Sequence, residues 1–239
     1  MNTNVCLQAV QVIAFDLDDT LCPERQYVHS GFKAVSIFLR EQGLIEQDLF
    51  PAMWSKFIAG EHSEIFNRVL DEYKINPTKD LIEKLVTVYR THLPEISLYP
   101  DARAVLDYFH ERKQLALISD GYKQTQTAKL AALEIKHYFN AVVLTDQLGR
   151  DCWKPSPMGF KNVMQALGGK PAEYVYIGDN PNKDFAAPRQ LGWKSICVRR
   201  TGGVYTESIA PNALFEADFL VNDLYEAAKL LDPAFTTTQ

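Results

Sequence analysis

Six short apolar runs along the chain have the length and composition of buried β-strands. Amphipathic helical patterns separate most of them, so the sequence predicts parallel βαβ units with helices on both faces. We therefore expect an α/β fold, a Rossmann-like doubly wound parallel sheet. The six runs are residues 12–15, 115–119, 141–145, 174–177, 195–198 and 218–221.

Turn and capping residues mark where some of the helices begin and end. Asp101 is expected to cap one helix, and Ser156-Pro157 is expected to open another that ends at Gly168. A further helix is expected over about residues 122–136.

The first two runs lie about 100 residues apart, which is far more than one crossover helix needs. The surplus contains at least three amphipathic helices, and Thr78 is a candidate cap for one of them. We expect a core domain formed by residues 1–21 and 99–239, with a small α-helical domain, 22–98, inserted into it. Its two connections, near residues 22–24 and 96–100, are candidate hinges.

Composition narrows the class of protein. The chain has 239 residues, of which 46% are hydrophobic and 23% are charged, as is typical of a globular enzyme. A net charge of −5 argues against a nucleic-acid or membrane surface, and no apolar stretch approaches the ~18 residues of a membrane span.

The four cysteines are scattered without metal-binding spacing, and residues 1–11 lack a basic n-region. They are Cys6, Cys22, Cys152 and Cys197. We expect reduced thiols in a cytoplasmic protein that is a monomer or a homodimer.

Carboxylates follow the first apolar run directly, in the segment Asp16-Leu17-Asp18-Asp19-Thr20. Charged groups at the end of a buried strand need compensation, and a bound cation would supply it. In an extended chain, Asp16 and Asp18 share a face while Leu17 points into the core. Two acids on one face suggest a metal ligand, a nucleophile and an acid–base.

Three further polar motifs follow later strands. Ligands of open α/β sheets bind at the carboxyl ends of the strands, so the four motifs are expected to converge. The three motifs are Ser119-Asp120-Gly121, Lys154 before a helix, and the segment 178–184 with Asp179 and Asp184.

This order of motifs, DxDxT then Ser then Lys then GDxxxxD, resembles the haloacid dehalogenase-like (HAD) hydrolase superfamily. The inserted helical segment is similar to the cap that one class of these enzymes carries between its first two motifs. The resemblance implies a cytoplasmic phosphatase that acts on a small phosphorylated metabolite and uses Mg²⁺.

The resemblance also implies a role for each motif. Asp16 would be the nucleophile, and Asp18 would protonate the leaving group and then activate water. Mg²⁺ would be held by Asp16, the Asp18 backbone carbonyl and Asp179, with Asp184 supporting its water shell or Lys154. The phosphoryl group would be bound by Thr20, by Lys154 and by the Ser119-Asp120-Gly121 segment.

Two residues depart from the common pattern. Asp120 stands where the family usually has Asn, so its charge is expected to point away or to be neutralised. Asp19 stands where Gly is common, which is a variant that also belongs to the pattern.

Several alternatives share part of this site. A haloacid dehalogenase uses an aspartate nucleophile but needs no metal and no second acid, and a phosphosugar mutase differs mainly in its cap. A non-enzymatic alternative is a phospho-accepting signalling module or a phosphate-binding protein. The clustered acids together with Lys154 favour a phosphatase. Candidate pocket residues in the helical insert are Tyr27, His29, Trp54, Phe57 and His62.

Overall fold

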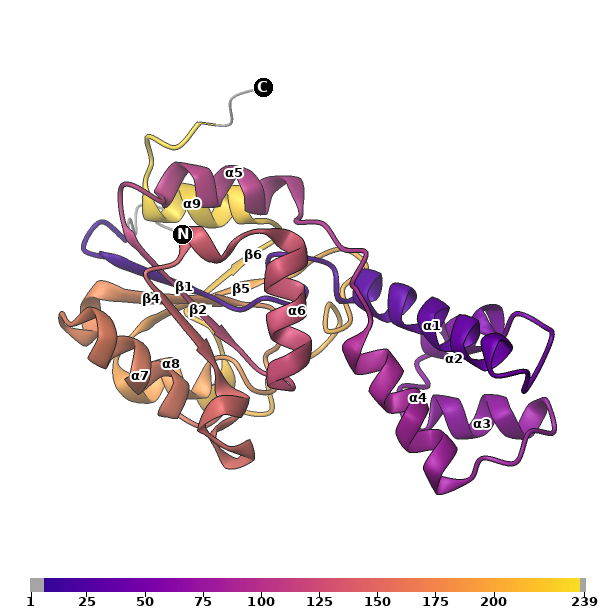
Figure 1. Ribbon diagram of the computed structural model, residues 1–239. Helices are drawn as coiled ribbons and strands as arrows, with labels where there is room; N and C mark the ends of the chain where they lie inside the picture. The colour runs from indigo at the N-terminus through magenta and orange to yellow at the C-terminus, as the bar shows by residue number, and fades with distance from the viewer. Residues whose placement is uncertain (1–6, 237–239) are drawn as a thin grey trace. The chain divides into compact units, whose positions relative to one another are not determined.

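The six strands of the computed structural model, which describes residues 7–236, form one parallel sheet (Figure 1). Its strand order is β3-β2-β1-β4-β5-β6. Each strand lies within one residue of its predicted bounds, because strands buried on both faces are continuous apolar runs. The strands are β1 (Val12–Phe15), β2 (Gln114–Ser119), β3 (Ala141–Leu144), β4 (Tyr174–Gly178), β5 (Lys194–Val198) and β6 (Phe219–Val221).

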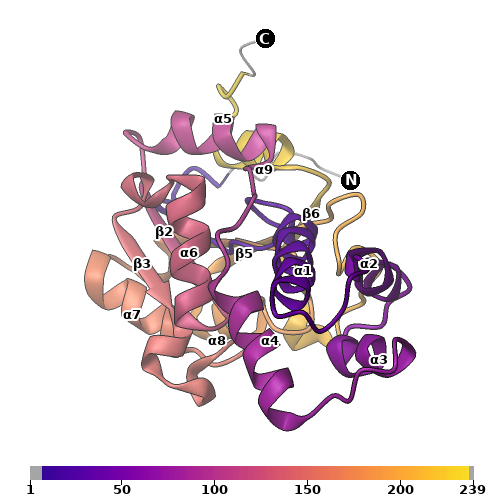
Figure 2. The same ribbon diagram turned by 45° about the vertical axis from the view of Figure 1, so that its right-hand side comes forward.

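Helices cover both faces of the sheet, so the predicted doubly wound α/β fold is confirmed. Helices α5 (Pro100–Phe109) and α9 (Leu224–Leu231) lie side by side on one face (Figures 1 and 2). Helices α7 (Met158–Leu167) and α8 (Ala186–Leu191) lie on the other. Helix α6 (Lys123–Leu133) connects β2 to β3.

The alternation of side chains along β1 divides the core between these two layers. Val12 and Ala14 pack in a cluster with Phe160 of α7 and Tyr174 of β4. Ile13 and its alternate neighbours point to the opposite face and are equally buried. Each large apolar side chain buried in this way stabilises the fold by about 1.5–3 kcal/mol. The sheet is therefore a rigid support for the loops at its carboxyl edge.

Two helix starts differ from the sequence prediction. Helix α5 begins at Pro100 with Tyr99 as its N-cap, and Asp101 lies inside the first turn as a buried partner of Arg200. Helix α7 begins at Met158, two residues after Ser156, and ends at Gly168 as predicted.

The chain divides into two compact units, each described here by itself. The small unit is Arg25–Ile96, and the large unit comprises the described residues on either side of it. The helices of this insert are α1 (Glu24–Glu41), α2 (Phe50–Ile58), α3 (Ile65–Glu72) and α4 (Lys79–Thr91), and the first residue of α1 still belongs to the large unit. Three of them were predicted, and the predicted cap Thr78 accepts a hydrogen bond from Leu81 N at 3.3 Å. Helix α2 was not predicted.

Aromatic side chains form much of the core of the small unit. The ring of Phe32 meets the rings of Phe57, Phe66 and Tyr89, with centroids 5.8–6.3 Å apart. Tyr27 is buried, and its hydroxyl donates to the Tyr89 carbonyl at 3.0 Å. Tyr27 and Phe57, which the sequence offers as pocket residues, therefore contribute to this core.

Cys22, Cys152 and Cys197 are free thiols, and Cys6 lies outside the described residues. Among residues 7–236, no helix combines the length and the apolar character needed to cross a membrane.

Candidate active site

The first acidic motif forms a tight loop at the carboxyl end of β1. Asp16 N still donates to the Ile177 carbonyl of β4 at 2.8 Å, so Asp16 sits directly at the last rung of the sheet. Leu17 is fully buried, as predicted. The strand order reverses between β1 and β4, and the crevice at such a point is where open α/β sheets bind ligands.

Asp19 ties this loop to two other segments. Its backbone has φ 50°, a left-handed conformation that favours Gly. Its carboxylate accepts hydrogen bonds from Glu24 N at 2.9 Å and from Val204 N at 2.7 Å. An aspartate here supplies two contacts that the more common Gly cannot make, which offsets the backbone strain.

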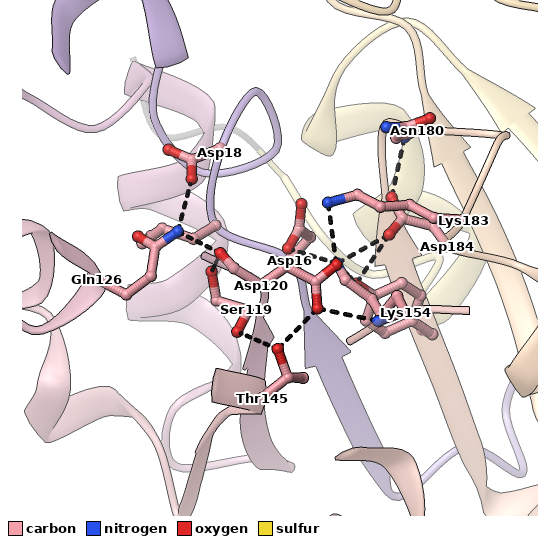
Figure 3. A network of polar contacts seen from close by, with 12 residues as sticks. Asp16, Asp18, Ser119, Asp120, Gln126, Thr145, Lys154, Asn180, Lys183 and Asp184 are labelled. Carbon is pink, nitrogen blue, oxygen red and sulfur yellow. Dashed lines mark hydrogen bonds and ion pairs between the residues drawn. The ribbon is translucent and has the colours of Figure 1, made fainter. Parts of the chain in front are cut away.

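Three carboxylates meet beside the end of β1. Oxygen atoms of Asp16, Asp179 and Asp184 lie within 4.8 Å of one another, and all three side chains are buried. Asp184 accepts a hydrogen bond from Asn180 N at 2.9 Å, which fixes the turn after β4 (Figure 3). Gly178 leaves room for this arrangement, because a Cβ there would lie 2.6 Å from Asp184 Oδ2.

Lys154 lies beside two of these acids and has no exposed side-chain surface. Its Nζ is 2.7 Å from Asp16 Oδ1 and 2.8 Å from Asp184 Oδ1, and it donates to Tyr176 Oη at 2.8 Å. Burial alone would lower the pKa of Lys154, but the carboxylates of Asp16 and Asp184 outweigh burial and raise it well above its usual range. Lys154 is therefore a fixed positive charge at the site.

One ammonium does not balance the charge of this cluster. Burial, reinforced by the charge of Asp184, raises the pKa of Asp16 to about 6 despite the proximity of Lys154. Burial and the neighbouring carboxylates of Asp184 and Asp16 raise the pKa of Asp179 well above its usual range. A divalent cation would relieve this repulsion, and Mg²⁺ takes oxygen ligands that usually include one or two carboxylates. The residues present therefore fit a magnesium site.

Asp18 turns away from this cluster toward α6 (Figure 3). Its Oδ1 lies 2.6 Å from Lys129 Nζ, and its Oδ2 accepts from Gln126 Nε2 at 3.0 Å. Burial alone would raise the pKa of Asp18, but Lys129 and Gln126 outweigh burial and hold it below its usual value. The carboxylate of Asp18 is thus not one of the three that meet, whereas Asp16, Asp179 and Asp184 are.

The second motif brings Asp120 into a buried polar network. Asp120 Oδ1 accepts from Thr145 Oγ1 at 2.8 Å and from Lys154 N at 3.1 Å, and Oδ2 pairs with Lys183 Nζ at 3.1 Å. Burial would raise the pKa of Asp120, but Lys154 and Lys183 lower it below its usual value. The negative charge that was unexpected at this position is therefore neutralised by Lys183.

The residues on either side of Asp120 are also constrained. Ser119 is buried at the end of β2, where its carbonyl accepts from Thr145 Oγ1 at 3.3 Å. Gly121 has φ 114°, and a Cβ there would lie 2.7 Å from Gln126 Nε2. Glycine at this position leaves space for the Gln126 side chain.

Thr20 is fully buried, and its Oγ1 has no hydrogen-bond partner among the described residues. A buried hydroxyl without a hydrogen-bond partner destabilises the folded protein unless a ligand or a water molecule binds to it. This orphaned donor is consistent with a phosphoryl oxygen binding at Thr20.

The sequence prediction did not assign a role to five residues that complete these networks. Lys129 and Gln126 place polar groups on the buried face of α6, and the helical spacing of the sequence contains this signal. The others depend on tertiary contacts that local sequence does not encode. The five are Gln126, Lys129, Thr145, Tyr176 and Lys183.

A family model and two curated relatives match this chain. Residues 10–192 match the haloacid dehalogenase-like hydrolase family. A glyceraldehyde 3-phosphate phosphatase of Methanopyrus kandleri is 28% identical over 199 residues, which cover 80% of this chain and 84% of the relative. An N-acylneuraminate-9-phosphatase of Rattus norvegicus is 26% identical over 94% of this chain and 95% of its own length.

A solved structure shows the same fold. The HAD-hydrolase YfnB of Bacillus subtilis, whose crystal structure contains magnesium, superposes with a TM-score of 0.68 at 16% identity. The superposition covers 93% of this chain and 99% of YfnB.

Proposed function

Because the chain belongs to the haloacid dehalogenase-like hydrolase family, we propose that it is a Mg²⁺-dependent phosphatase that hydrolyses a small phosphate monoester. The observation that carries this proposal is the buried group of Asp16, Asp179 and Asp184 around Lys154, at the point where the strand order reverses. Both relatives described above are phosphatases by name. The substrate class is therefore a small phosphorylated metabolite.

Asp16 is the nucleophile in this proposal. Its carboxylate attacks phosphorus, the bond to the leaving oxygen breaks, and Asp18 gives that oxygen a proton. The resulting aspartyl phosphate on Asp16 is then hydrolysed by water. Thr20, Ser119 and Lys154 bind the oxygens of the transferring group.

Charge decides whether Asp16 can react with a phosphate dianion. Lys154 contributes one positive charge directly at Asp16 Oδ1. The carboxylates of Asp16 and Asp179, with the backbone carbonyl of Asp18, would hold Mg²⁺, and Asp184 would support its water shell and Lys154. When bound, the ion neutralises the charge that repels the nucleophile from the phosphoryl oxygens.

The small unit is the proposed cap, with the hinges near residues 22–24 and 96–100. The large unit holds every group that we assign to the phosphoryl transfer, and none that obviously reads the leaving group. We therefore assign substrate selection to the small unit.

An assay with 4-nitrophenyl phosphate tests the proposal. We expect hydrolysis with Mg²⁺, none after the metal is removed with a chelator, and recovery when Mg²⁺ is restored. Asp179→Ala is expected to raise the Mg²⁺ concentration required, and Ca²⁺ to inhibit, because Ca²⁺ prefers more ligands at longer distances. Full activity in metal-free enzyme would point instead to a dehalogenase-type mechanism.

The natural substrate requires a second experiment. A panel of phosphorylated metabolites, with release of inorganic phosphate as the readout, would identify it. A phosphosugar mutase would convert its substrate into an isomer without releasing phosphate. A signalling or phosphate-binding module would turn over none of the panel.

A further inference from the structure

The buried face of α6 carries polar side chains where a helix packed on a sheet usually carries apolar ones. Gln126 and Lys129 lie one helical turn apart and are only 2% and 3% exposed. Both bind the carboxylate of Asp18, and the carboxylate of Glu24 also acts electrostatically on Lys129. A buried ammonium without a partner would be strongly unfavourable, and Asp18 supplies Lys129 with an ion-pair partner at 2.6 Å.

The two donors divide the carboxylate of Asp18 between them. Lys129 Nζ lies 2.6 Å from Oδ1, and Gln126 Nε2 lies 3.0 Å from Oδ2. An ionised carboxylate has about four acceptor positions, so each oxygen keeps one that faces away from its α6 donor. The rotation of the carboxylate is fixed, while its remaining acceptor positions stay usable.

Gln126 is itself held in one orientation. Its Nε2 also donates to the carbonyl of Asp120, the residue that follows β2. The Gly121 position leaves no room for a Cβ beside this amide group. Gln126 of α6 therefore links the carboxylate of Asp18 to the backbone of Asp120 in the second motif.

We propose that Lys129 and Gln126 are positioning residues that hold Asp18 ready to act as the base in the second half of the reaction. This inference rests on the proposed function and names which side chains prepare one of its steps. The carboxylate of Asp18 is held by two donors and keeps acceptor positions open, which is the arrangement that a base requires. Neither residue touches phosphorus or water in this proposal.

The step that they support is the hydrolysis of the aspartyl phosphate. The oxygen of a water molecule forms a bond to phosphorus as Asp18 accepts one of its protons. The bond between phosphorus and the Asp16 oxygen breaks, which releases phosphate and restores the Asp16 carboxylate. The proton that Asp18 has gained is the one that it gives to the next leaving group, so the cycle balances.

Steady-state kinetics with 4-nitrophenyl phosphate separate the two halves of the reaction. Its leaving group needs little protonation, so kcat/KM reports the first half and the base step appears only in kcat. Lys129→Met is expected to lower kcat by about 10- to 100-fold, as loss of a supporting contact typically does. KM should fall in parallel, so kcat/KM should change less than about threefold. Gln126→Met should also lower kcat, by a smaller factor, and should likewise leave kcat/KM nearly unchanged.

Three variants complete the experiment. Lys129→Arg keeps a charged donor and should retain most of kcat. Lys123→Met makes the same substitution at the exposed start of α6 and should leave both parameters unchanged. Asp18→Asn should show the largest decrease in kcat relative to the decrease in kcat/KM. The aspartyl phosphate should accumulate in Asp18→Asn and Lys129→Met, detected as a burst of 4-nitrophenol.

The outcomes distinguish this inference from the proposed function. If Asp18→Asn lowers kcat more than kcat/KM but Lys129→Met lowers kcat and kcat/KM equally without a burst, Lys129 is merely structural and the inference is wrong. If Asp18→Asn does not lower kcat more than kcat/KM, Asp18 is not the base, and the inference falls with that assignment. If the wild-type protein does not hydrolyse 4-nitrophenyl phosphate at all, the proposed function fails first.

Discussion

Asp16 is the residue on which the proposed chemistry depends. Replacing it by Asn removes the nucleophile and a metal ligand while keeping the size of the side chain. We expect Asp16→Asn to lower kcat for 4-nitrophenyl phosphate by more than ~10³-fold, since covalent catalysis and metal binding fail together. Asp71→Asn, at an exposed position of α3, is the matched control. Near-normal turnover by a pure preparation of Asp16→Asn would rule out the assignment.

The ion pair of Asp120 and Lys183 can be tested as the reason why the site accommodates an aspartate where the family usually has Asn. Asp120→Asn keeps an oxygen for Thr145 Oγ1 and Lys154 N, so we expect it to change the free energy of unfolding by less than about 1 kcal/mol. Lys183→Met leaves the buried carboxylate of Asp120 without its ion-pair partner and should cost about 1–3 kcal/mol.

The double variant decides whether the two residues act as a pair. If Lys183 is there to neutralise Asp120, Asp120→Asn should recover most of the stability that Lys183→Met loses. Urea unfolding of the four proteins in this cycle gives the coupling free energy, which we expect to be about 1–2 kcal/mol. Strictly additive effects would mean that the ion pair does not explain this departure from the family pattern.

The sequence predicts the site residues that follow strands better than it predicts the partners that bind those residues. Asp16, Asp184 and Lys154 are predicted to converge because parallel strands all end at one edge, and the structure brings them together. The sequence does not predict that Asp18 pairs with Lys129, which lies 111 residues away on another element. Such a pair depends on how a helix packs, and the spacing of residues within one motif carries no information about it.

At the scale of elements, Arg200 joins four segments of the large unit. Its guanidinium donates to Asp101 Oδ2 at 2.5 Å and to the Thr20 carbonyl at 2.7 Å. Asp101 Oδ2 also accepts from Leu224 N at the start of α9. The loop after β5, the first turn of α5, the first acidic loop and α9 thus meet at one buried ion pair.

Removing the cation from this junction should be strongly destabilising. Arg200→Met leaves a buried carboxylate at Asp101, and losses of this kind are about 3–5 kcal/mol. The neighbouring Arg199 is exposed, so Arg199→Met is a matched control that should change stability by less than about 0.5 kcal/mol. Urea unfolding measures both. Equal and small losses would show that the junction contributes little.

The elements themselves are predictable to different degrees. The strand bounds are predicted to within one residue, because continuous apolar runs of this short length indicate buried strands. Helix α2 is not predicted, because its apolar positions Phe50, Met53 and Phe57 span little more than two turns of a helix. The helix start near Asp101 differs because Asp101 is a buried partner of Arg200. Helix α7 starts two residues after Ser156, whose Oγ accepts a hydrogen bond from Met158 N at 3.4 Å.

At the scale of the whole molecule, the two units divide the proposed tasks. The large unit holds the groups that act on phosphorus, and the small unit is proposed to choose the leaving group. His29 and Trp54 are only half-buried, and their rings contact each other with centroids 5.1 Å apart. They are better candidates for substrate contact than the buried Tyr27.

A ratio of kinetic constants tests this division. His29→Ala or Trp54→Ala should change the ratio of kcat/KM between two good substrates from the metabolite panel, with little effect on 4-nitrophenyl phosphate. Lys154→Ala should lower kcat/KM for all substrates alike, because it contacts the group that they share. If substitutions across the small unit never change that ratio while substitutions in the large unit do, the small unit is not the specificity element.

The most direct test of the account is to find where the phosphoryl group is carried. Enzyme turning over 4-nitrophenyl phosphate with Mg²⁺ would be quenched in acid, digested and analysed by tandem mass spectrometry. We predict a phosphoryl group on Asp16 in the wild-type protein and none in Asp16→Asn. A phosphoryl group on a different residue, or a pre-steady-state burst of 4-nitrophenol with no modification of Asp16, would contradict the account.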